Sequence, residues 1–171
     1  MRLPGRAAAF LLAAAAVLGW PLTAAAVEVG EPAPPITGPR ADGSSFALSE
    51  LSGDIVYVDF WASWCAPCRA AMPRLDELHA SLGARGFSVV GVNVDRKRRS
   101  AERMLEQVPV DFPVVFDPEG QWAERYALPG MPSGYLIDGD GVVRYRHTGY
   151  REGDLPKLAN EIEKLLEENQ P

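Results

Sequence analysis

Cysteine and histidine are scarce in this chain of 171 residues, which contains two of each. Both cysteines, Cys65 and Cys68, lie in the segment WCAPC. A closed zinc site needs four ligands, and His79 would lie about three helical turns beyond Cys68, too far to share one ion. A bridge between the two cysteines would close a very small loop, which restricts the unfolded chain least. The scarcity therefore disfavours zinc and a structural disulfide framework, and leaves redox chemistry for the pair.

Positive charge is also in short supply. Lysine and arginine number 17 against 23 acidic residues, which gives a formal net charge of −6. A nucleic-acid-binding surface needs a basic field, so we expect no nucleic-acid partner. Hydrophobic residues make up 47% and charged residues 23% of the chain, as in ordinary globular domains. We find no internal repeat and no linker long enough to separate a second domain.

Residues 1–26 have the pattern of a secretory signal peptide. Arg2 and Arg6 begin the segment, an uncharged apolar run follows, and small residues stand before Val27. An uncleaved membrane anchor is the alternative interpretation. The apolar run is short for a span of about 20 residues, and Pro21 interrupts its end, so cleavage is favoured.

Export to the periplasm is therefore expected, with a mature domain over residues 27–171. An exported chain enters an oxidising space, where structural disulfides usually accumulate. A single candidate pair at Cys65 and Cys68 is unusual there, and it favours exchange chemistry over a structural bridge.

The mature chain alternates strand and helix patterns. Residues 55–61 (IVYVDFW) form a nearly continuous apolar run that predicts a buried strand. From Ala66, apolar residues recur at helical spacing until Gly83 and Gly86 end the pattern. The remaining patterns predict a short strand and helical turn in 46–54 and strands at 87–95, 112–116, 134–138 and 142–150. They also predict helices at 100–108 and 155–169, and a short helix through Trp122 and Tyr126. This order predicts an α/β fold with a central mixed sheet flanked by helices.

The cysteine segment carries a family resemblance. VDFWASWCAPC (58–68) resembles the active-site segment of thioredoxins, and Pro73 matches the proline within their active-site helix. GMPSGYLID (130–138) resembles the segment that carries the thioredoxin cis-proline, with Pro132 in that role. The signal peptide, GVNVD (91–95) and extra strand and helix material before this segment resemble the exported TlpA/ResA/CcmG branch. The resemblance implies a thioredoxin-like fold with that branch's strand-helix insertion, and a thiol:disulfide oxidoreductase without a bound cofactor or metal.

The predicted helix start assigns the thiols different roles. Thiolate is the attacking species, and an N-terminal helix end favours an anion. Cys65 should therefore be the exposed nucleophile, and Cys68, one turn further and more buried, should resolve the mixed disulfide. Pro67 stiffens the turn, and Trp64 and Pro67 should form an apolar rim for the partner chain.

The resemblance implies a second part of the partner groove. A cis peptide bond before Pro132 would leave Met131 lining the groove, where its backbone N–H and C=O would bind an extended substrate chain. A plain turn proline is the alternative. Trp61 belongs either to the rim or to the core, and we favour the core.

Asp59 is the most informative acid, because it lies within the apolar strand. Alternation turns it away from Val58 and Phe60, and burial of a lone carboxylate should raise its pKa. Asp59 is therefore a candidate proton acceptor for Cys68, and its position matches the buried aspartate of thioredoxins. The thioredoxin lysine on the adjacent strand is replaced by Gly91.

Position 71 departs from the pattern of the exported branch. Many of those relatives have glutamate three residues after the second cysteine, whereas this chain has Ala71. We expect the acid on the strand, Asp59, to take over that role. His79 and His147 have no cysteine or acid at motif spacing, and we interpret them as surface or packing residues.

The features together predict a periplasmic protein-disulfide reductase acting in cytochrome c or metalloprotein assembly. Expected partners are cysteine-containing exported proteins, such as apocytochrome c or copper-site assembly proteins, and a membrane thiol reductant; we expect a monomer. A disulfide oxidase or isomerase, and a non-enzymatic copper or thiol-partner chaperone, remain alternatives. A peroxidase is disfavoured, because Ala62 stands where peroxiredoxins place Thr or Ser.

Overall fold

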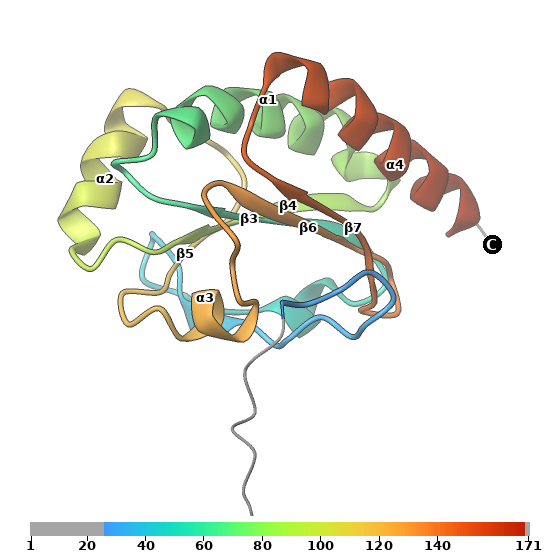
Figure 1. Cartoon of the computed structure of the whole chain (residues 1–171), viewed down its shortest axis with the longest axis horizontal. Coiled ribbons are helices and arrows are strands. Elements are labelled where there is room, and N and C mark those ends of the chain that lie inside the picture. Colours follow the sequence, from blue (N-terminus) through green and yellow to red (C-terminus); the bar gives the residue numbers. More distant parts are fainter. Residues whose placement is uncertain (1–25, 170–171) are drawn as a thin grey trace, which may run out of the picture.

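A five-stranded mixed sheet forms the centre of the structure, a computed structural model that describes residues 26–169 (Figure 1). The strand order is β5-β4-β3-β6-β7. The strands are β3 (Ile55–Trp61), β4 (Phe87–Asn93), β5 (Val114–Phe116), β6 (Ser133–Ile137) and β7 (Val143–Thr148). The first three run parallel, β6 pairs antiparallel with β3, and β7 pairs antiparallel with β6. The predicted mixed sheet is therefore confirmed.

Helices cover both faces of this sheet. The upper face in Figure 1 carries α1 (Ala66–Leu82), α2 (Arg98–Gln107) and α4 (Leu155–Glu168). The lower face carries α3 (Gln121–Arg125) and the hairpin of β1 (Thr37–Pro39) and β2 (Ser45–Ala47), followed by η1 (Leu48–Leu51). Two further short 3-10 turns are η2 (Gly83–Arg85) and η3 (Glu152–Asp154). From β3 onward this is the predicted element order, a thioredoxin-like fold with β5 and α3 before β6.

Strand β3 separates two hydrophobic cores. All seven of its residues are buried, and alternation sends them to opposite faces. Val58 and Phe60 pack in the core below the sheet, whereas Tyr57 and Trp61 pack in the core beneath α1, α2 and α4. Asp59 lies in the same alternation as Tyr57 and Trp61, so its carboxylate enters the second core.

Some predicted boundaries were wrong. Strand β1 was not predicted, and its three residues form a strand only through their pairing with β2. Strand β5 begins at Val114, two residues later than predicted, and the preceding Pro113 has no N–H for a ladder hydrogen bond. Strand β4 ends at Asn93, before the predicted end at Asp95.

The predicted signal peptide lies almost entirely outside the described residues. The described chain begins at residue 26, and Val27 is the first residue that packs in a core. Between residues 26 and 169, no helix combines the length and the apolar character that crossing a bilayer requires.

Candidate active site

The two cysteines lie at the N-terminus of α1, shortly after the end of β3. Cys65 is the N-cap residue and Cys68 lies in the first turn, and their sulfurs form a disulfide with an S–S distance of 2.02 Å. The backbone N–H of Cys68 donates a hydrogen bond to Sγ of Cys65 at 3.2 Å. After reduction, this N–H and the positive end of the helix dipole favour a thiolate on Cys65.

The surface around the pair differs from the expectation in one respect. Cys65 is only 4% exposed, so it is not the open thiol that we predicted, although Cys68 is more deeply buried at 0%. A tight turn, in which the N–H of Cys65 bonds the carbonyl of Ala62 at 3.1 Å, folds Cys65 inward. Trp64 is 70% exposed and Pro67 is also exposed. These two residues form a rim beside Cys65.

The Met131–Pro132 peptide bond is cis, as predicted. The carbonyl of Pro132 accepts a hydrogen bond from the N–H of Gly149 at 2.8 Å, and the hydroxyl of Ser133 donates to the carbonyl of Gly130 at 2.8 Å. Pro132 is buried, whereas Met131 is half-buried and packs against both cores. The end of β7 therefore holds this loop in place.

Asp59 is a buried carboxyl group in the core beneath α1. It is 2% exposed, and its Oδ2 has no hydrogen-bond partner within the described part of the chain. Burial raises the pKa of Asp59 to about 8. The carboxyl group therefore changes charge near neutral pH, as a group that exchanges protons with a thiol must.

Trp61 helps to explain why, in the part of the chain that the structure describes, no cation lies beside Asp59. Gly91 is the partner of Asp59 on β4, and it occupies the position of the thioredoxin lysine. A Cβ at Gly91 would lie 2.9 Å from Phe112 and 3.0 Å from Nε1 of Trp61. Trp61 itself is completely buried, which confirms the predicted core position. Two aromatic rings thus fill the space that a lysine stem would need.

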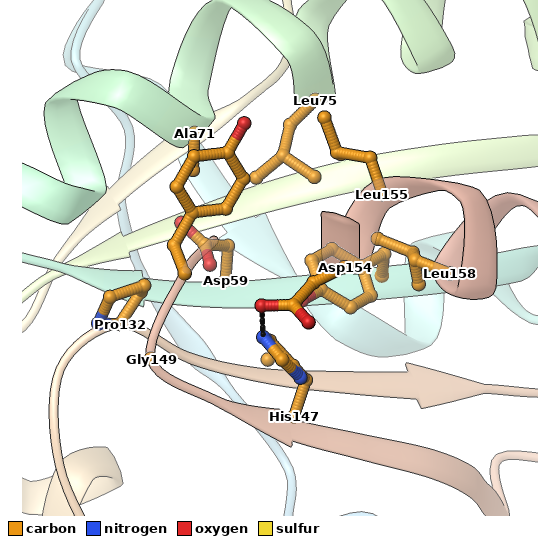
Figure 2. Close-up of a pocket in the computed structure, with 12 residues that line it drawn as sticks. Asp59, Ala71, Leu75, Pro132, His147, Gly149, Asp154, Leu155 and Leu158 are labelled. Atoms are coloured by element: carbon orange, nitrogen blue, oxygen red, sulfur yellow. Dashed lines mark ion pairs between the residues drawn. The ribbon is translucent and has the colours of Figure 1, made fainter. Parts of the chain in front are cut away.

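A small cavity of about 20 Å³ adjoins Asp59, beneath α1 and the start of α4 (Figure 2). Ala71, the position of the missing glutamate, forms part of its wall, and so does Pro132. The other lining residues are Tyr57, Leu75, Gly134, His147, Gly149, Tyr150, Asp154, Leu155 and Leu158. Because Ala71 lies one helical turn after Cys68, the cavity connects the inner side of the cysteine helix with the cis-proline loop.

His147 and Asp154 also line this cavity, which the sequence did not indicate. Nε2 of His147 lies 3.3 Å from Oδ2 of Asp154, and Figure 2 shows the pair at the cavity. The distance is that of an ion pair, but within the described chain Nε2 is buried and makes no hydrogen bond. The prediction of His147 as a surface or packing residue agrees with its partly exposed side chain and with its ring stacked on Tyr145, whereas its contact with Asp154 was not predicted. The sequence did not indicate the pair because Asp154 lies seven residues after His147, beyond a turn.

Asp95 is a third residue that the sequence did not indicate, and it anchors the loop before the cysteines. Its carboxylate accepts hydrogen bonds from the N–H and the hydroxyl of Ser63, each at 2.8 Å, and from the side-chain amide of Asn93 at 2.8 Å. Asp95 is 7% exposed. The end of β4 thereby holds Ser63, two residues before Cys65.

Replacing Asp95 with alanine should lower the free energy of unfolding by about 3 kcal/mol, because three donors around a buried carboxylate lose their acceptor. Urea unfolding of the oxidised protein measures the change. Asp42→Ala is the control: its carboxylate accepts hydrogen bonds from exposed Ser44, so the loss should stay below about 1 kcal/mol. Equal losses in both variants would contradict the anchoring role.

The chain is similar in sequence to known thiol-disulfide oxidoreductases. A family model described as Redoxin matches residues 28–162. The thiol-disulfide oxidoreductase ResA of Geobacillus kaustophilus is 32% identical over 146 residues, which cover 85% of this chain and 80% of the relative.

Two solved structures share the fold. A crystal structure from Chlorobium tepidum, assigned as a thiol:disulfide interchange protein DsbE, superposes with a TM-score of 0.80 at 42% identity, over 82% of this chain and 99% of that chain. The thioredoxin domain of a thiol-disulfide oxidoreductase from Bacteroides vulgatus gives a TM-score of 0.72 at 27% identity, over 80% and 98% of the two chains. The chain therefore belongs to the Redoxin family, as a thiol-disulfide oxidoreductase of the ResA/DsbE type with Cys65 and Cys68 as its redox-active pair.

Proposed function

We propose that this oxidoreductase is an exported reductase of protein disulfides. The observation that carries the proposal is the placement of the pair: Cys65 caps α1 beside the exposed Trp64, and Cys68 lies inside the helix. Ala-Pro between the cysteines lacks the histidine of strong exported oxidants, which favours a reducing potential.

The reaction proceeds through a mixed disulfide. The Cys65 thiolate attacks one sulfur of the partner's disulfide, and the other partner sulfur leaves as a thiolate. Asp59 in its carboxylate form then accepts the proton of Cys68, and the Cys68 thiolate attacks Sγ of Cys65. The second partner thiolate leaves and takes up a proton. Two electrons pass from the dithiol to the partner, and Cys65–Cys68 ends as the disulfide.

The partner surface follows from the same residues. Trp64 and Pro67 form the rim beside Cys65 and offer apolar contact, and Met131 offers its backbone to an extended chain. The substrates are cysteine-containing exported proteins, with apocytochrome c and copper-site assembly proteins as the proposed classes. A membrane thiol reductant restores the dithiol.

The periplasm is the proposed location. Its support is the signal-peptide pattern of residues 1–26 together with the packing of Val27, the first residue after the proposed cleavage point, in the lower core. The mature domain is then residues 27–171.

Partner trapping tests the proposal directly. Cys68→Ser cannot resolve the mixed disulfide, so it should accumulate covalent complexes with exported cysteine proteins, visible as bands that disappear on treatment with a thiol reductant. Cys65→Ser has the same amino-acid composition as Cys68→Ser but lacks the attacking thiol. It should therefore accumulate at least about tenfold less covalent complex. Equal trapping by both variants would overturn the assigned roles, and the absence of covalent complexes from both would overturn the exchange function.

A further inference from the structure

The cavity behind the cysteine helix connects two titratable groups that lie on different strands. Asp59 on β3 pairs with Gly134 on β6, and Gly134 pairs with His147 on β7. Directly opposite residues of antiparallel strands point to the same face. Asp59 and His147 therefore share one row on one face of the sheet, about 10 Å apart across two strand spacings.

The glycine between them leaves room for a hydroxyl group. A Cβ at Gly134 would overlap the hydroxyl and ring of Tyr57, so this hydroxyl occupies the place of a side chain between Asp59 and His147. Burial, and then the charge of Asp59, raises the pKa of Tyr57 well above its usual value. Tyr57 therefore stays protonated, and a phenol can accept one proton while it donates another.

The far end of the row reaches the outside. Nε2 of His147 is buried, but its side chain as a whole is 23% exposed and that of Asp154 is 22% exposed. An imidazole nitrogen can accept and donate a proton, and Nε2 of His147 lies 3.3 Å from the carboxylate of Asp154. The cavity of about 20 Å³ is also large enough for one water molecule beside these groups.

We propose that His147 and Asp154 form a proton relay that carries protons between Asp59 and solvent, through the Tyr57 hydroxyl and the cavity. This inference rests on the proposed role of Asp59 as the proton acceptor of Cys68. Asp59 takes the proton from the Cys68 thiol, His147 takes it from Asp59, and solvent takes it from His147. Asp59 returns to the carboxylate, and no electrons move along the row.

The relay has few competing charges within the described chain. The wall from α1 and α4 is apolar and consists of Ala71, Leu75, Leu155 and Leu158. The titratable groups that face the row are Tyr57 and Asp59 from β3, Tyr145 stacked on the ring of His147 at 6.5 Å, Tyr150 after β7, and Asp154 from η3. Charged residues near Tyr150 are Arg74, Glu77 and Glu152. Nε2 of His147 is therefore the buried imidazole nitrogen that can take the proton from Asp59.

Single-turnover reaction with Ellman's reagent tests the relay in the reduced full-length chain. The first thionitrobenzoate is released when Cys65 attacks, and the second when Cys68 resolves the mixed disulfide. His147→Gln should leave the first release unchanged and slow the second about tenfold at pH 7. Asp154→Asn and Tyr57→Phe should each slow the second release severalfold.

Two further measurements separate proton transfer from a structural effect. Added imidazole should restore the second release in His147→Ala, because it replaces the lost proton acceptor, and the pH profile of the second release in this variant should differ from that of wild type. His79→Gln is the matched control. Its imidazole accepts a hydrogen bond from the N–H of Val89 at 3.2 Å, outside the cavity, so its rates and its response to imidazole should be those of wild type.

The outcomes are distinguishable. If His147→Gln and Asp154→Asn keep the wild-type second release while Asp59→Asn slows it, the relay is wrong and the role of Asp59 stands. If Asp59→Asn also keeps the wild-type rate, the proposed base itself is wrong, and the relay fails with it. If His147→Gln folds poorly, Asp154→Asn tests the relay by the same criteria, because the Asp154 side chain is partly exposed and its replacement disturbs the core less.

Discussion

Replacing Asp59 with asparagine should slow the resolving step about a hundredfold at pH 7 and leave the attack by Cys65 nearly unchanged. Asparagine has almost the same shape but cannot accept the proton of Cys68. Burial raises the pKa of Asp59 to about 8, so the wild-type rate should rise with pH until about pH 8. In the variant, Cys68 must ionise unaided, and the difference between the two proteins should narrow above that pH.

The second thionitrobenzoate release, followed from pH 6 to 9, measures this effect. Asp117→Asn is a matched control, because Asp117 is another buried aspartate, whose carboxylate caps α3 on the opposite face of the sheet. It should resolve the mixed disulfide at the wild-type rate. Superimposable profiles of Asp59→Asn and wild type across this range would refute the base assignment.

The same substitution should stabilise the oxidised protein. Asp59 has a pKa of about 8 when folded against a reference value of 3.8, so between these values the folded state holds a proton that the unfolded state releases. Wild-type stability therefore falls as pH rises from about 4 to 8. Three pH units at about 1.4 kcal/mol each give an upper limit of about 4 kcal/mol gained by Asp59→Asn at pH 7. Urea unfolding at pH 4 and pH 7 should show a gain at pH 7 alone.

Gly134→Ala should lower the free energy of unfolding by about 3 kcal/mol and the melting temperature by about 10 °C. The added methyl group would overlap the ring and hydroxyl of Tyr57, which is buried and packs in the core beneath α1, α2 and α4. Calorimetry of the oxidised variant gives the change. Gly83→Ala is the control, since a Cβ there meets no atom within 4 Å and the backbone is helical.

A double variant shows whether Tyr57 causes the loss. Leucine at position 57 lacks the ring atoms that overlap the new methyl group, so Gly134→Ala should cost less in a Tyr57→Leu background than in wild type. If the two substitutions change the free energy of unfolding in a strictly additive way, the strain arises elsewhere.

The sequence predicted most of the fold because its strongest patterns are local. The apolar run of β3 and the helical spacing after Ala66 do not depend on distant residues, and the resemblance placed Cys65, Cys68 and Pro132. Alternation alone assigned Asp59 to the face opposite Val58 and Phe60, as the structure has it. Strand β1 was missed because its three residues have no pattern of their own.

The residues missed in the site depend on register between strands. His147 shares a row with Asp59 only because both pair with Gly134 in the sheet, and a one-residue shift would place the imidazole on the other face. The sequence pattern predicts Asp95 as the end of a strand. In the structure its carboxylate accepts hydrogen bonds from Ser63, which follows the neighbouring strand β3. Such cross-strand partners leave no periodic signal in a single sequence.

The reduction potential of the Cys65–Cys68 couple tests the central claim most directly. Equilibration of the full-length chain with glutathione or dithiothreitol buffers, with tryptophan fluorescence as readout, gives the value. A protein-disulfide reductase should have a potential near that of thioredoxin, about −270 mV. A potential near about −120 mV, that of a strong oxidant, would contradict the reductase and make the chain a disulfide oxidase.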